Sequence, residues 1–119
     1  MQKRIPEGKK YVSFYITENV RSSIQMLIEI TDLPKTRIYN KAYQYFLEKR
    51  DQTIDPRILI KKRTDPQYIR RDVLETDYIK MEYYLKMKEL SEKNKCSVAC
   101  VIYAALVEYI TIFSMRIVR

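Results

Sequence analysis

The 119-residue sequence contains no histidine, no tryptophan and a single glycine. Histidine is the most common general base of enzymes and a frequent metal ligand, so its absence argues against hydrolytic and zinc chemistry. With Gly8 as the only glycine, a glycine-rich phosphate-binding loop cannot form. We therefore expect neither an enzyme nor a bound cofactor, metal ion or small-molecule substrate.

Cysteine is also scarce. Cys96 and Cys100 lie four residues apart with helical spacing, where two side chains share a face but seldom reach disulfide geometry. With no histidine and no second ligand pair, they are interpreted as buried thiols of a cytoplasmic protein. The first residues are basic and are not followed by an apolar run, so we expect no secretory signal.

Long apolar runs are absent except between Cys96 and Met115, where Glu108 is the only charge. A membrane anchor of this length is possible, but it would place Glu108 near the middle of the bilayer. The same apolar density is typical of a helix buried in a tight dimer. We therefore expect a buried helix and no membrane span.

Positive charge dominates the composition. The sequence has 23 lysines and arginines against 15 aspartates and glutamates, a net charge of +8 at pH 7. This balance favours polyanionic partners, nucleic acid first and an anionic membrane surface second. A chain of this length has room for only a small core, so sharing a core between copies would stabilise it, and we expect a homodimer or tetramer.

The first half of the sequence predicts one strand and two helices. Residues 9–17 alternate with a period of two, and the period changes to 3.6 after the N-cap types of residues 17–19. The first helix is expected to end near Asp32 and the second, after a turn at Pro34, near Lys49. The predicted strand has an apolar face of Val12, Phe14 and Ile16 and an opposite face of Tyr11, Ser13 and Tyr15.

The helical and strand periods both break between residues 51 and 71. Asp-Pro pairs at 55–56 and 65–66 are turn signals around a short apolar and basic run. We interpret this segment as a solvated linker, although the run could also add a strand or touch phosphate.

Beyond the linker the pattern of the first half recurs. A shift of 63 residues places Ile16 on Ile79 and Leu27 on Leu90, which predicts an internal duplication. The second copy is divergent, because its inward strand positions include Glu75 and Asp77. An acidic face would bury poorly, so a bulge, a shifted register or no ribbon is expected there.

A short strand, a capped helix, a turn and a second helix in about forty basic residues resembles the ribbon-helix-helix family of Arc, MetJ and CopG. Residues 79–98 resemble the helical part of that family's consensus, and two tandem units resemble the TraY type. The resemblance implies a mainly α fold, in which strands from two units pair into an antiparallel ribbon. Residues 1–50 would be the DNA-binding unit, 51–71 the linker and 72–119 a divergent unit for oligomerisation.

The resemblance also implies the site residues. Outward strand side chains of this family contact bases in the major groove, and the start of its second helix contacts phosphate. Base contacts therefore map onto Tyr11, Ser13 and Tyr15. The family usually has Arg, Lys, Gln, Asn or Thr there, so an alternative is that the two tyrosines are ordinary strand aromatics. The expected phosphate contacts are Lys3, Arg4, Lys9, Lys10, Lys35, Thr36 and Arg37.

The function implied is sequence-specific binding of double-stranded DNA, as a transcriptional repressor or as a relaxosome or partition factor in plasmid conjugation or maintenance. We expect the ribbon to form between chains, because Val12, Phe14 and Ile16 would meet an equally apolar strand in an identical copy. Pairing of the two units within one chain is the competing topology. A protein-interaction or membrane-tethered scaffold with a basic surface is the second class of function, and RNA binding is the third.

Overall fold

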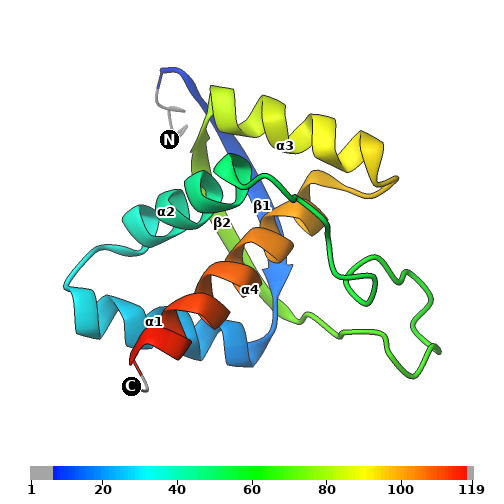
Figure 1. Ribbon diagram of the computed structural model, residues 1–119, viewed down its shortest axis with the longest axis horizontal. Coiled ribbons are helices and arrows are strands. Elements are labelled where there is room, and N and C mark those ends of the chain that lie inside the picture. Colours follow the sequence, from blue (N-terminus) through cyan, green and yellow to red (C-terminus); the bar gives the residue numbers. More distant parts are fainter. Residues whose placement is uncertain (1–6, 118–119) are drawn as a thin grey trace, which may run out of the picture.

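The computed structural model describes the backbone of residues 7–117 and the side chains of residues 7–113. Over this range the fold is mixed, with four helices and one two-stranded antiparallel sheet. The order strand, helix, helix occurs twice (Figure 1). The elements are β1 (Lys9–Ile16), α1 (Glu18–Thr31), α2 (Lys35–Glu48), β2 (Val73–Lys80), α3 (Met81–Lys93) and α4 (Val98–Ile117).

Local signals set the ends of the first two helices where the sequence predicts them. Thr17 is the N-cap of α1, and its hydroxyl accepts a hydrogen bond from the Val20 N–H at 3.1 Å. The helix ends at Thr31, and its C-cap, Asp32, adopts a left-handed conformation with φ of 59°. Pro34 directly precedes α2, where its fixed φ suits a helix start.

The two strands pair with each other inside the one chain. Lys9 lies opposite Lys80 and Ile16 opposite Val73, and all eight positions of each strand are matched. The prediction that strand 9–17 pairs with the same strand of a second chain is therefore wrong. The expectation of a bulge, a shifted register or no ribbon in the second half is wrong as well. In Figure 1 the helices lie over one face of this ribbon.

Tyrosines of α2 make the acidic inner face of β2 compatible with burial. The Tyr43 hydroxyl donates to Asp77 Oδ2 at 3.0 Å, and the Tyr39 hydroxyl donates to Glu75 Oε1 at 2.8 Å. Lys35 adds an ion pair with Glu75 at 3.2 Å. Burying a carboxylate costs much less free energy when hydrogen bonds replace those of water. The inner positions of β2 thus lie where the alternation predicts, although their polarity is the reverse of β1.

The two halves share one hydrophobic core. Phe14 from β1, Phe46 from α2 and Met87 from α3 belong to the same cluster of buried side chains. Helix α4 crosses the middle of the molecule, and residues 101–106 are all buried (Figure 1). It packs against the other three helices and β1. The apolar run of the second half is therefore the central core helix of the chain.

Among the described residues, no single helix is long and apolar enough to cross a membrane. Helices α3 and α4 reach the necessary length and apolar content only when they are counted together, and the chain bends by 105° between them. Glu108, the charge in the apolar run, forms an ion pair with Lys49.

The linker is more than a connector. None of residues 51–71 lies in a helix or strand, but the side chains of Ile54 and Ile58 are buried in the common core. The Cys100 thiol donates to the Ile58 carbonyl at 3.4 Å. The first part of the linker is thereby fixed against α4, while Lys61, Lys62 and Arg63 remain exposed.

The tyrosine hydroxyls should contribute unequally to stability. Tyr43→Phe leaves the buried Asp77 without its hydroxyl donor, whereas in Tyr39→Phe the carboxylate of Glu75 keeps Lys35. We expect Tyr43→Phe to lower the free energy of unfolding by about 1–3 kcal/mol and Tyr39→Phe by less. Urea denaturation at neutral pH measures both. Equal losses would contradict this account of β2.

Candidate nucleic-acid interface

The outer face of the ribbon presents six uncharged side chains in three cross-strand pairs, and the pair Lys9 and Lys80 lies at its end. Because successive side chains of a strand point to opposite faces, burial of Phe14 and Ile16 leaves the odd-numbered residues of β1 outside. The structure therefore brings the three predicted base-contact residues onto one exposed face, together with three residues of β2. The pairs are Tyr11 with Tyr78, Ser13 with Thr76, and Tyr15 with Leu74.

Sequence reasoning missed the contribution of β2 to this face. The outward alternation of Leu74, Thr76 and Tyr78 is visible in the sequence, but the expected partner of β1 was another β1. Tyr15 and Leu74, which lie opposite each other, are 54% and 56% exposed. One end of the face is therefore apolar and aromatic, and its middle carries two hydroxyls.

The two tyrosines at the other end contact each other. The ring centroids of Tyr11 and Tyr78 lie 5.2 Å apart with an interplanar angle of 56°. Tilted aromatic pairs of this kind contribute about 0.5–1.5 kcal/mol beyond their buried area. Tyr11 is 43% exposed. Tyr11 therefore both stabilises the pairing of the two strands and exposes part of its side chain to solvent.

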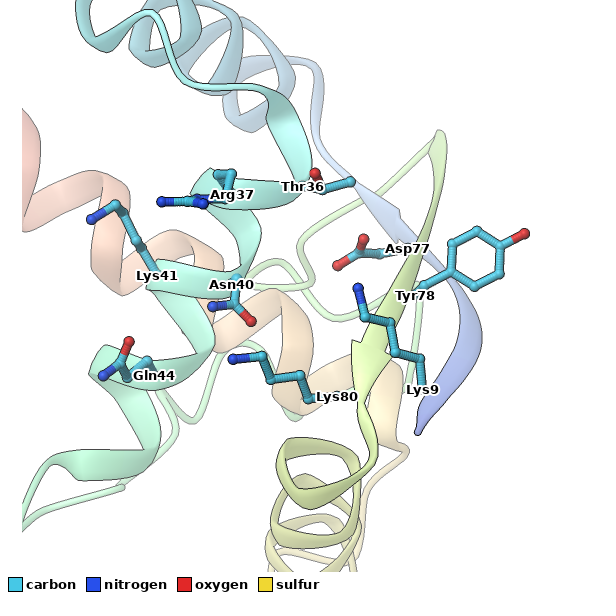
Figure 2. A pocket seen from close by; sticks show the side chains of 9 residues that line it. All are labelled: Lys9, Thr36, Arg37, Asn40, Lys41, Gln44, Asp77, Tyr78 and Lys80. Atoms are coloured by element: carbon cyan, nitrogen blue, oxygen red, sulfur yellow. The ribbon is translucent and has the colours of Figure 1, made fainter. Parts of the chain in front are cut away.

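A basic groove of about 500 Å³ lies between β2 and α2, next to this face. Figure 2 shows Lys9 and Lys80 entering it from the strands, with Lys80 pointing toward Asn40 of α2. Arg37 and Lys41 line it from the helix, so four cations border the groove against the single carboxylate of Asp77. The remaining lining residues are Thr36, Asn40, Gln44 and Tyr78.

The predicted phosphate contacts separate into groups. Lys9, Thr36 and Arg37 meet at the groove. Lys35 is engaged with Glu75, and the Lys10 ammonium lies 5.5 Å from the ring centroid of Tyr84 in α3. Lys3 and Arg4 lie outside the described residues.

Two further groove cations were not predicted. Lys41 follows Arg37 by four residues, so the helical period of the exposed α2 face was a signal that could have found it. Lys80 joins the groove because β2 pairs with β1, the topology that the sequence offered only as the alternative.

Asp77 is the buried acid at this groove, with 5% of its surface exposed. Burial raises the pKa of its carboxyl, and the hydrogen bond from Tyr43, the Tyr78 N–H and the charges of Lys9 and Lys35 oppose this rise. Its Oδ1 finds no hydrogen-bond donor among the residues that the structure describes. The negative charge of Asp77 is therefore disfavoured, and the cations determine the sign of the groove.

The cysteines have no feature of a reactive or metal site. Cys96 and Cys100 are free thiols; burial raises the pKa of both, and that of Cys100 reaches about 11. No cluster of three or more metal-ligating side chains occurs in the described part of the chain. The raised pKa values favour the protonated thiols at neutral pH, and a protonated thiol is a poor nucleophile and metal ligand.

The raised pKa of Asp77 predicts a pH-dependent effect of Asp77→Asn. In the wild type the protonated carboxyl favours the folded state below the ordinary pKa of an aspartate, 3.8, and this contribution is lost as the pH rises through the raised pKa of the folded protein. The side-chain amide of the Asp77→Asn variant carries no charge at any pH in this range. The stability of Asp77→Asn relative to wild type should therefore increase between about pH 4 and pH 7. Urea denaturation across this range measures the difference, and a constant difference would contradict the burial account.

Comparison with known proteins gives no family for this chain. No family model, no curated protein and no solved structure matches it. The placement of the chain's own residues is therefore the basis on which its function can be inferred.

Proposed function

We propose that this protein binds double-stranded DNA with sequence preference, using the outer face of the β1–β2 ribbon in the major groove. The observation that carries the proposal is one exposed ribbon face with hydroxyl and aromatic side chains, bordered by a groove that four cations line. The net charge of +8 supports a polyanionic partner.

The size and chemistry of the ribbon support this placement. Two paired strands lie about 4.8 Å apart, and a major groove about 12 Å wide admits such a ribbon. The hydroxyls of Ser13 and Thr76 can donate to or accept from base edges. The apolar side chain of Leu74 suits the methyl group of thymine.

The basic groove supports contact with the DNA backbone. A ribbon in the major groove of DNA has a phosphate strand on each side. The basic groove of the protein lies on the β2 side of the ribbon. Thr36 and Arg37 stand in the first turn of α2, where free N–H groups and the helix dipole attract anions. Lys9, Lys41 and Lys80 add charge at the same place.

We assign the chain to the ribbon-helix-helix type, with both strands of the ribbon in one chain. The repeated order of elements supports this, because α1 and α3 begin at Glu18 and Met81, and α2 and α4 at Lys35 and Val98, each pair 63 residues apart. This is the spacing that the duplication hypothesis requires. A non-enzymatic, cytoplasmic role as a repressor or as a conjugation or partition factor follows from this assignment.

A homo-oligomer remains part of the proposal. One chain supplies a whole ribbon, so association is needed only to place several ribbons along one DNA. Met26 and Ile30 are 41% and 52% exposed on α1, and association would bury such apolar side chains.

Base readout is tested with duplexes selected from a random pool and with scrambled versions of them. Ser13→Ala, Thr76→Ala and Tyr15→Ala should weaken binding to the selected duplex by about 5- to 150-fold, because each contact discriminates by about 1–3 kcal/mol. Binding to the scrambled duplex should hardly change. The matched control is Ser22→Ala on the exposed surface of α1. Unchanged preference in all three variants, or equal competition by single-stranded RNA, would overturn the proposal.

Backbone contact is tested through salt dependence. Each lost phosphate contact lowers the slope of log affinity against log salt by about 0.9. Arg37→Gln and Lys80→Gln should therefore each reduce the slope by about one for selected and scrambled duplexes alike. Lys35→Gln should reduce it less, because Lys35 is paired with Glu75. Slopes equal to that of the wild type in Arg37→Gln and Lys80→Gln would contradict contact between the basic groove and the DNA backbone.

A further inference from the structure

The two sides of the ribbon differ in the cations that the helices supply. On the β2 side, α2 begins with Lys35, Thr36 and Arg37. Its counterpart α4 packs against β1 and has no lysine or arginine between Val98 and Phe113. A duplex on this ribbon would meet helix-borne cations on one side only.

The linker lies on the side that lacks them. In Figure 1 α2 stands to the left of the ribbon, and residues 51–72 loop out on its right, next to the start of α4. The Arg71 guanidinium lies over the ring of Tyr103 in α4, 4.8 Å from its centroid. This contact, with the buried Ile54 and Ile58, fixes the linker to α4 at both of its ends.

The linker also contains a cationic pocket. Arg63, Tyr68, Arg70, Arg71 and Asp72 line a cavity of about 390 Å³. Three guanidinium groups thus face one carboxylate, and the Arg70 pair with that carboxylate at 3.0 Å is largely exposed and contributes little.

One of the three guanidinium groups is incompletely satisfied. Arg71 Nη1 is buried and finds no hydrogen-bond acceptor in the described part of the chain. A buried N–H without an acceptor costs free energy. The guanidinium groups of Arg63 and Arg70 are exposed, so an anion can reach them. Arginine is suited to phosphate, because two parallel N–H groups can bind two of its oxygens.

We propose that this linker pocket binds a phosphate of the DNA backbone on the β1 side of the ribbon. The proposal rests on the DNA-binding function proposed above. The linker arginines take the place of the basic helix start that α4 lacks, and the exposed Lys61 and Lys62 add charge nearby. The two backbone strands are then held by different groups, α2 on one side and the linker on the other. A single chain would therefore bind an asymmetric site in one orientation.

The test is the salt dependence of duplex binding by the full chain with Arg63→Gln and Arg70→Gln combined. Both residues are exposed and lie outside the core, so the fold should be retained, as thermal unfolding checks. The expected results are a slope lower by about one to two and roughly tenfold weaker binding at moderate salt. The preference for selected over scrambled duplex should stay unchanged. Arg71→Lys, which keeps the charge but loses bidentate geometry, should weaken binding with little change in slope.

The matched control removes two charges from α3, which runs away from the ribbon toward its C-terminal end (Figure 1). Lys88 and Lys93 are exposed there, and Lys88→Gln with Lys93→Gln should keep the wild-type slope. A wild-type slope in the arginine variant, or an equal loss in the control, would overturn the linker proposal while DNA binding stands. Absence of duplex binding by the wild type would overturn the proposed function and the linker proposal with it.

Discussion

The hydrogen bonds from Tyr39 and Tyr43 of α2 to Glu75 and Asp77 of β2 determine how the strands of this chain combine. Without them, Asp77 would be buried with no side-chain donor from α2, and Glu75 would keep only its ion pair with Lys35. With them, β2 lies against α2 and pairs along its whole length with β1. The outer face of the ribbon, the groove beside it and the position of the linker all depend on this pairing.

The same hydrogen bonds make the two halves of the molecule unlike. At the positions 63 residues after Tyr39 and Tyr43, helix α4 carries Ile102 and Leu106, both buried in the core. Helix α4 packs against β1, whose inner residues are apolar, while the more polar α2 covers the acidic β2. One half thus provides a basic helix start at the surface and the other the central apolar helix. The asymmetry of the proposed DNA site follows from this division.

Much of the fold could be predicted from local sequence, because periodicity and caps act over a few residues. The alternation of residues 9–17 gave the exposed face of Tyr11, Ser13 and Tyr15, and Thr17 and Pro34 marked where the first two helices begin. The pairing of β1 with β2 was not the favoured prediction, because burial of β2 depends on the hydroxyls of Tyr39 and Tyr43. These tyrosines precede their partners in β2 by more than thirty residues. The polarity of Glu75 and Asp77 alone suggested, wrongly, that β2 does not pack against the core. Ile54 and Ile58 were missed because residues without a helical or strand period give no signal of burial.

The central claim is that one chain builds the whole ribbon, and isotope-filtered NMR on a mixture of labelled and unlabelled chains tests it most directly. Tyr11 and Tyr78 have ring centroids 5.2 Å apart, close enough for proton contacts between the two strands. The account predicts these contacts in spectra of uniformly labelled protein and their absence from the spectrum that passes only contacts between different chains. Contacts between β1 of one chain and β1 of another in that second spectrum would contradict it.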